Sequence, residues 1–268
     1  MKQEYLKIPA IEKLVPFPNF GTVLLQHARE FPQKLAISFS KRKYTYDEVT
    51  KICARLDIPK QKIKLSFHDI ENDTLLLLAC LYQGRELDID FSSRSSINYL
   101  QPENQGEELP FFDPPYVKLD DHACSLNNEY HFSQYQVLLA AQAIGKAFKL
   151  FREGASYCPE NINSIADLIF GVLAPLYYCK TVEMVFTSQK DYYQYAWKKE
   201  ISSSLRDAAY LFPKNAKAQG FLLLESFDNA LGMGPIVSPE GKMLELLGYE
   251  FEKFEDKWSV KGHGVADQ

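Results

Sequence analysis

Apolar and polar residues follow one another along this chain in two periods, one typical of amphipathic helices and one typical of strands. Apolar positions three or four residues apart predict helices at about residues 20–31, 46–56, 72–82, 133–151 and 164–178. Short apolar or alternating runs predict strands at about residues 36–39, 62–67, 87–91, 155–158 and 182–186. Strands that alternate with helices predict an α/β domain with a parallel-rich sheet whose strands are covered by helices.

Local signals place the ends of several of these helices. Thr45 and Glu48 have the spacing of a capping box at the start of the second helix. Asn72 or Asp73 can cap the third helix, and Gly84 is suited to end it. The order along the first part of the chain is therefore helix, strand, helix, strand, helix, strand.

A hairpin is predicted before the long fourth helix. Two strand-like runs, residues 123–126 and 129–132, flank Asn127 and Asn128, a pair that tolerates the positive φ of a two-residue turn. Ser133 then caps the helix that follows.

Changes in composition suggest three segments. Prolines and acidic residues are concentrated between residues 100 and 121, which indicates a linker or surface loop. Beyond Gly220, glycine and proline separate short strand-like runs. We therefore expect a first α/β subdomain at 1–110, a second at 111–219, and a small β-rich tail at 220–268.

Charge and hydropathy exclude several classes of function. A formal net charge of -5 offers no broad basic field, so we expect no nucleic-acid partner. The longest apolar runs are far shorter than the roughly 20 residues of a membrane-spanning helix, so no span is expected. The first residues carry no uninterrupted apolar stretch like that of a secretory signal, which predicts a cytoplasmic protein.

The residues most often used in catalysis form no clear constellation. The chain has five cysteines, and they lie too far apart in sequence for a paired metal-ligand motif. His122 and His131 flank the predicted hairpin, and a shared role would require the two strands to bring them together. We interpret them as exposed or hydrogen-bonded imidazoles.

The order of several sequence blocks resembles a known family. Residues 31–36 (FPQKLA) and 44–49 (YTYDEV) are similar to phrases that open the large N-terminal domain of adenylate-forming enzymes, the acyl-CoA synthetase and AMP-ligase superfamily. Three further blocks resemble that domain in the same order, at residues 73–101, 133–150 and 164–185. The resemblance implies the family's α/β fold, in a shortened form nearest in compactness to o-succinylbenzoate:CoA ligase.

The family's phosphate loop has no clear counterpart. That loop is rich in Ser, Thr and Gly, ends in Lys, and holds the phosphates of ATP. It should lie between Ala123 and Ser133, where this chain has ACSLNNEYHFS with neither glycine nor lysine and with the anionic Glu129. The resemblance therefore implies a domain from which the phosphate cradle has been deleted.

Other family motifs survive only in fragments. The family's adenine and metal motif aligns with residues 221–225 (FLLLE), which makes Glu225 the candidate Mg²⁺ ligand; the alternative is a surface carboxylate at a strand end. Phe221, Glu225 and Asn161 are the candidate lining of a vestigial nucleotide or acyl pocket, made smaller and more apolar by Leu222 and its two neighbours. The sequence ends at VKGHGVADQ, so the family's C-terminal domain with its catalytic Lys is expected to be absent.

Two functions remain open on the sequence. The first is a pseudoenzyme or binding module with no assigned catalytic residue and no required cofactor, whose partner is a small carboxylate or a protein. The alternative is an AMP-forming acid–thiol ligase that another chain completes, with ATP, Mg²⁺ and CoA as its cofactors. A hydrolase is disfavoured because the chain has no GxSxG nucleophile elbow.

Overall fold

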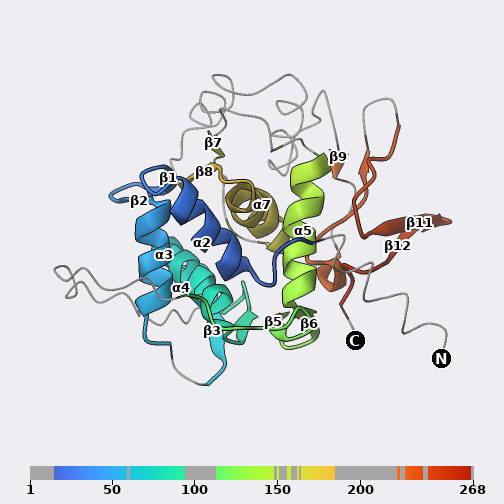
Figure 1. Cartoon of the computed structure of the whole chain (residues 1–268). Helices are drawn as coiled ribbons and strands as arrows, with labels where there is room; N and C mark the ends of the chain where they lie inside the picture. Colours follow the sequence, from blue (N-terminus) through green and yellow to red (C-terminus); the bar gives the residue numbers. More distant parts are fainter. Residues whose placement is uncertain are drawn as a thin grey trace.

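A computed structural model of the chain describes residues 15–58, 61–93, 113–147, 150, 156–157, 162, 164–184, 222–223, 227–237 and 241–266. Helices and two four-stranded sheets make up the body, and a strand-rich tail lies against one side of it (Figure 1).

Three helices from the first part of the chain pack against one another: α2 (Phe20–Glu30), α3 (Tyr46–Arg55) and α4 (Ile70–Gln83). The capping box at the start of α3 is confirmed. The Glu48 N–H donates to Thr45 Oγ1 at 3.2 Å, and the Thr45 N–H donates to Glu48 Oε2 at 2.8 Å. Gly84 ends α4 with a φ of 64°, a left-handed conformation that suits glycine.

The predicted cap of α4 is wrong. Asp69 is the N-cap, and its side chain accepts a hydrogen bond from the Asn72 N–H at 3.2 Å. Asn72 and Asp73 already lie within the first turn and are buried there, where Asn72 Nδ2 donates to Asp73 Oδ1 at 3.1 Å. Burial raises the pKa of Asp73. The apolar helix is buried from its first turn onward, so its polar first-turn residues are buried with it.

The first sheet has the order β2-β1-β8-β7. Its strands are β1 (Leu35–Phe39), β2 (Lys43–Thr45), β7 (Ser156–Tyr157) and β8 (Thr181–Met184). β8 runs parallel to both β1 and β7, and β2 joins the edge as the antiparallel partner of β1.

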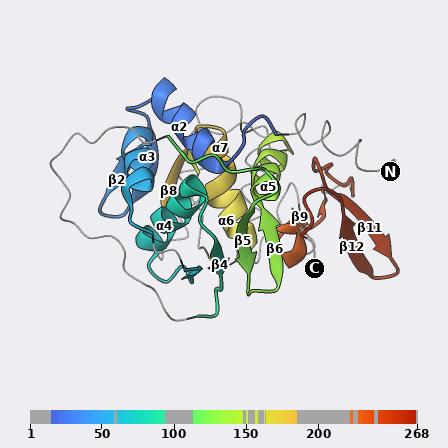
Figure 2. The same cartoon turned by 60° about the horizontal axis from the view of Figure 1, so that its bottom comes forward.

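The second sheet has the order β3-β4-β5-β6 and lies beside α4 and α5 (Figure 2). Its strands are β3 (Ile63–Leu65), β4 (Leu87–Ile89), β5 (His122–Leu126) and β6 (Tyr130–Ser133). β3, β4 and β5 are parallel, and β6 returns from β5 as the predicted hairpin. Each four-stranded sheet takes strands from both sides of residue 110. The boundary predicted between 1–110 and 111–219 therefore does not coincide with the division between the sheets.

The second half of the body contains α5 (Gln134–Ala147) and a broken helix that packs against it. The broken helix consists of α6 (Ile165–Leu168), the π-helical turn η1 (Ile169–Leu173) and α7 (Ala174–Tyr177), where the sequence predicted one helix. Pro175 has no N–H to donate to the preceding turn, and its ring crowds the carbonyl four residues earlier. The wider π turn directly before this proline relieves that conflict.

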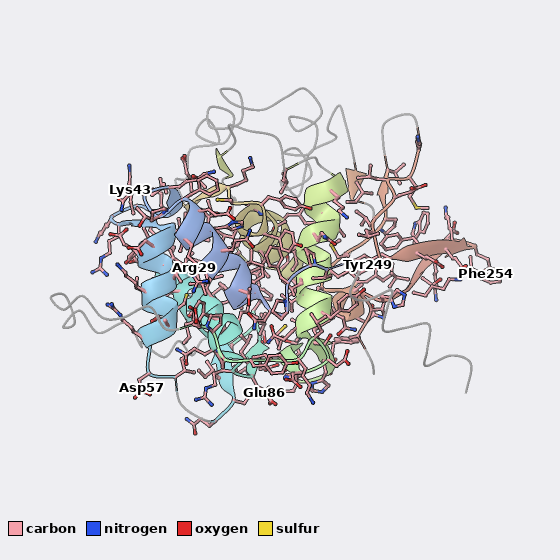
Figure 3. All side chains as sticks on the ribbon, viewed as in Figure 1. Arg29, Lys43, Asp57, Glu86, Tyr249 and Phe254 are labelled. Carbon is pink, nitrogen blue, oxygen red and sulfur yellow. The ribbon has the colours of Figure 1, made fainter. Side chains whose placement is uncertain are left out.

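The tail is β-rich, as predicted. β9 (Leu222–Leu223) pairs with β10 (Ile236–Val237), and β11 (Glu250–Phe254) pairs with β12 (Lys257–Lys261), both antiparallel. A short 3-10 helix, η2 (Asp228–Ala230), lies between β9 and β10. The β11–β12 hairpin extends away from the body, and Phe254 at its tip is 78% exposed (Figure 3).

The tail is attached to the body at α5. Gln136 Nε2 donates to the carbonyl of Val265 at 2.7 Å, and Tyr249 is buried directly before the projecting hairpin. Large side chains fill the core between the sheets and helices, among them Phe20, Tyr46 and Phe132. Within the described residues, no helix combines the length and the apolar character needed to cross a bilayer.

Candidate functional site

A cavity of about 430 Å³ lies at the carboxyl ends of β3, β4 and β5. Ligands of open α/β sheets collect at this edge of parallel strands. The polar side chains that line it are Lys64, Asp90, Ser92, Asn127, Asn128, Ser164 and Asp228. Its apolar lining comes from Phe91, Leu126 and Ile165. The lining given by the described residues is therefore mainly polar.

The turn between β5 and β6 forms one wall of this cavity. Asn127 and Asn128 have φ values of 54° and 57°, so the positive φ predicted for this pair is confirmed. The loop is one residue longer than predicted, because Leu126 pairs with Tyr130 and Glu129 belongs to the turn rather than to the strand. The Asn127 N–H donates to the carbonyl of Ile89 at 3.0 Å, and the Glu129 N–H donates to the carbonyl of Leu126 at 3.0 Å. The Asn128 N–H donates to Asp88 Oδ1 at 2.8 Å. All three backbone donors of the turn are thus used within the protein.

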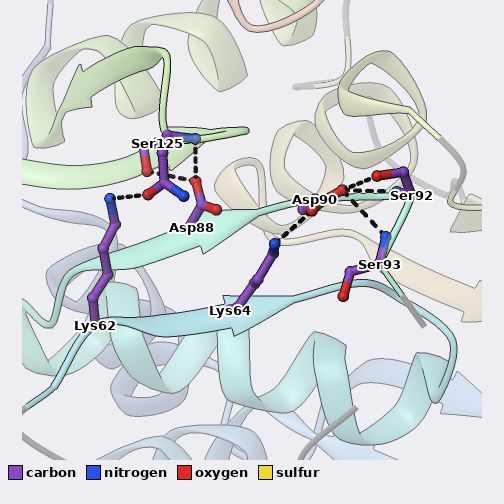
Figure 4. Close-up of polar contacts among 8 residues, drawn as sticks. Lys62, Lys64, Asp88, Asp90, Ser92, Ser93 and Ser125 are labelled. Atoms are coloured by element: carbon purple, nitrogen blue, oxygen red, sulfur yellow. Dashed lines mark hydrogen bonds and ion pairs between the residues drawn. The ribbon is translucent and has the colours of Figure 1, made fainter. Parts of the chain in front are cut away.

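Asp88 connects two strands to this turn (Figure 4). It lies opposite Ser125 in the parallel pairing of β4 with β5, and both side chains are buried. Oδ1 of Asp88 accepts the Ser125 hydroxyl at 2.7 Å in addition to the Asn128 N–H. Lys62 Nζ donates to Asn128 Oδ1 at 2.8 Å on the outer side of the same turn. Hydrogen bonds to a carboxylate are stronger than those between neutral groups, so the two bonds to Asp88 hold the turn tightly against β4.

Lys64 and Asp90, which both line the cavity, form an ion pair (Figure 4). Their Nζ and Oδ2 atoms are 2.6 Å apart. Oδ1 of Asp90 accepts the Ser92 hydroxyl at 2.5 Å and the N–H groups of Ser92 and Ser93 at 2.9 and 3.2 Å. The Lys64 ammonium, and after it the Ser92 hydroxyl, hold the pKa of Asp90 well below its usual range. The charge of Lys64 is therefore balanced within the protein.

The remaining wall comes from the broken helix and the tail. Ser164 caps α6, and its hydroxyl accepts the Asp167 N–H at 3.2 Å. Asp228, the first residue of η2, brings a second carboxylate to the cavity. Among the lining residues that the structure describes, Lys64 is the one ammonium, and the carboxylates of Asp90 and Asp228 give these residues a net negative charge. Such a cavity repels a polyphosphate.

The three predicted pocket residues cannot be placed in this geometry. Phe221, Glu225 and Asn161 lie outside the described residues, so their roles remain predictions. Leu222, next to Phe221, belongs to β9. Among the residues that the structure describes, no group of three or more His, Cys, Asp or Glu side chains is arranged to hold a metal ion.

His122 and His131 are brought together by the hairpin. Nδ1 of His131 lies 3.3 Å from Nε2 of His122, within hydrogen-bond distance, as one of the interpretations of the sequence expected. Burial lowers the pKa of His122. His122 begins β5, whereas the cavity lies at its other end near Leu126, so the pair stands apart from the cavity.

The sequence interpretation missed Asp88, Lys64, Asp90 and Asp228. For Asp90 a signal was available, because it directly follows the short apolar strand β4 and so falls at the carboxyl edge. Lys64 lies between buried Ile63 and Leu65 in β3, and this alternation predicts that Lys64 is exposed. It does not predict that Lys64 pairs with Asp90.

Comparisons with known proteins support the fold. No family model matches the chain, and no curated protein matches its sequence. The NpsA N-terminal subdomain of Klebsiella oxytoca in complex with anthranilyl-AMSN is similar in structure, at 11% identity over 94% of this chain and 88% of that chain, with a TM-score of 0.60.

Two further structures agree with this likeness. A putative long-chain-fatty-acid CoA ligase from Rhodopseudomonas palustris is 10% identical, with 92% of this chain and 89% of that chain covered and a TM-score of 0.61. VinN is 11% identical, with 94% and 91% covered and a TM-score of 0.60. At such identities the likeness shows the fold alone, and it confirms the predicted α/β architecture.

Proposed function

We propose that this chain, which has the fold of the N-terminal domain of adenylate-forming enzymes, is a catalytically degenerate form of that domain that acts as a binding module. Its ligand in this proposal is a small carboxylate that enters the cavity at the carboxyl ends of β3, β4 and β5.

One observation carries the proposal: the turn that stands in the place of a phosphate loop has no backbone donor left for an anion. The N–H groups of Asn127, Asn128 and Glu129 are taken by the Ile89 carbonyl, the Asp88 carboxylate and the Leu126 carbonyl. Phosphate cradles depend on successive backbone N–H groups that point at the anion. ATP therefore does not fit this turn.

The charges around the cavity support the same conclusion. Adenylate formation requires a polyphosphate to be held and its developing charge to be neutralised. Lys64 is paired with Asp90, and Asp228 adds a carboxylate for which the described lining residues supply no second cation. A monovalent carboxylate meets a much smaller repulsion than ATP and can exchange with Asp90 for the Lys64 ammonium.

The size of the cavity suits a small ligand. Its volume of about 430 Å³ lies within the range of about 300–1,000 Å³ that small-molecule sites occupy. The similar NpsA subdomain was solved with anthranilyl-AMSN, a compound with an aromatic acyl group. We therefore choose anthranilate as the first ligand to test.

Calorimetry with two ligands tests the proposal. We expect no heat from ATP with Mg²⁺, and weak binding of anthranilate that falls at least tenfold in Lys64→Met. Lys43→Met is the matched control, because Lys43 is an exposed lysine on β2, away from the cavity, and it should bind as the wild type does.

The opposite result would favour the ligase. Micromolar affinity for ATP, together with pyrophosphate release in the presence of a carboxylic acid and CoA, would overturn the proposal and leave a ligase completed by another chain. Loss of that affinity in Glu225→Ala would then assign Mg²⁺ binding to this residue. If neither ligand binds, the small-carboxylate proposal fails and a protein becomes the remaining candidate partner.

A cytoplasmic location remains part of the proposal. Four of the five cysteines lie within the described part of the chain, and all four are buried free thiols: Cys53, Cys80, Cys124 and Cys179. Free thiols are common in reducing compartments, where disulfides do not persist.

A further inference from the structure

Two imidazole rings face each other across the β5–β6 hairpin. Their ring centroids are 5.4 Å apart, and His131 Nδ1 is 3.3 Å from His122 Nε2. The pairing of β5 with β6 shifts between His122 and Cys124, where one residue of β5 is left without a partner. This bulge turns His122 toward the side of the hairpin on which His131 lies.

The separation of the two nitrogens matches that of two ligands on one metal ion. Imidazole nitrogens bind Zn²⁺ at about 2.0–2.1 Å, so two of them in a tetrahedral complex are about 3.3–3.4 Å apart. The observed distance of 3.3 Å falls in this range. In the free protein one ring donates a hydrogen bond to the other. For both nitrogens to bind a metal ion, the donor ring would have to carry its proton on its other nitrogen, by exchange with solvent.

The surroundings of the pair suit a metal ion. His131 is exposed, and the His122 side chain keeps 24% of its surface accessible, so an ion can approach from solvent. Glu86 Oε2 lies 3.8 Å from Nδ1 of His122, the nitrogen on the other side of the ring. At this distance the two atoms do not form a hydrogen bond, but the negative charge of a carboxylate there favours the proton on Nδ1 and leaves the lone pair of Nε2 for the metal.

We propose that His122 and His131 form a two-histidine site for a divalent transition metal such as Zn²⁺, Ni²⁺ or Cu²⁺, with water completing the coordination. Imidazole is a preferred ligand of these ions, whereas Mg²⁺ prefers oxygen. The ion would link the first residue of β5 to β6 and so stabilise the hairpin that carries the Asn127 turn. The proposal is independent of the proposed function, because the cavity lies at the other end of β5.

Calorimetric titration of the full chain, without an affinity tag, with Zn²⁺ tests the site. We expect one binding event in the wild type and at least tenfold weaker binding in His131→Ala. His68→Ala is the control, since His68 is exposed like His131 and lies outside the hairpin; it should bind Zn²⁺ as the wild type does. Mg²⁺ should give no heat at the same concentrations.

A second measurement guards against loss of structure in the variants. His131 is exposed, so His131→Ala should keep the unfolding temperature of the metal-free wild type. Zn²⁺ should raise the unfolding temperature of the wild type and of His68→Ala, and leave that of His131→Ala unchanged. Absence of Zn²⁺ binding to the wild type, or equal binding to His131→Ala, would overturn the proposal.

Discussion

Removal of the Asp88 carboxylate should destabilise the protein, because this one side chain accepts two hydrogen bonds. Asp88→Ala leaves two donors without an acceptor, the hydroxyl of fully buried Ser125 and the N–H of Asn128. A hydrogen bond to a charged group contributes about 1.5–3 kcal/mol, so the two together contribute about 3–6 kcal/mol. The second oxygen of Asp88 is buried and has no hydrogen-bond partner among the described residues. Burying this oxygen costs free energy, which lowers the net contribution of Asp88 to stability. We therefore expect a loss near the lower end, about 3 kcal/mol.

Urea unfolding measures this loss. With a slope of about 3 kcal/mol/M, the midpoint of Asp88→Ala should lie about 1 M below that of the wild type. Ser125→Ala removes one of the two donors and should cost about 1.5 kcal/mol, the lower end of the same range. The double variant should cost less than the sum, because each single change already breaks the bond that the two residues share. A midpoint of Asp88→Ala within 0.2 M of the wild type, or strictly additive losses, would refute this account of the turn.

Four further outcomes follow from local features. Thr45→Ala removes the capping box of α3 and should cost about 1 kcal/mol, seen as a fall of about 2–4 °C in the thermal midpoint. Gly84→Ala should cost more than Gly241→Ala: both glycines have positive φ, but an added Cβ meets a valine methyl at 2.5 Å in the first and nothing within 4 Å in the second. The pKa of Asp90 is lowered in the folded protein, so its contribution to stability is present above about pH 4 and is lost as the pH falls further. Asp90→Asn should therefore show a smaller fall in the urea midpoint below about pH 4 than the wild type does. Burial raises the pKa of Cys124 to about 12, so iodoacetamide should label the Cys124 peptide slowly in native protein and rapidly in urea, and equal rates would contradict its burial.

The parts of the structure that local sequence determines were predictable. The capping box of α3 and the positive φ of Asn127 and Asn128 depend on residues within four positions of each other, and both formed as expected. The cap of α4 was mispredicted because three polar residues, Asp69, Asn72 and Asp73, compete within one turn, and tertiary burial decides among them.

Long-range contacts were not predictable in the same way. The ion pair of Lys64 with Asp90 joins neighbouring strands 26 positions apart, and its partners are defined only once β3 and β4 are aligned. The approach of His122 to His131 depends on a bulge, which hydrophobic alternation does not reveal. At the candidate site the sequence predicted the turn and the carboxyl edge, but not the carboxylates that occupy it.

The pairing of strands from both halves of the chain has a consequence for how the protein folds. Ile37 of β1 pairs with Val182 of β8, so the first sheet closes only after about half of the chain has been brought together. Bringing residues so distant in sequence together costs chain entropy before the contacts between the strands can compensate for it. We therefore expect slow, cooperative folding. A cut anywhere between residues 93 and 113 would leave two fragments, each of which lacks strands of both four-stranded sheets. Separately the fragments should stay largely unfolded, and when mixed they should recover the native circular dichroism at a rate that depends on their concentration.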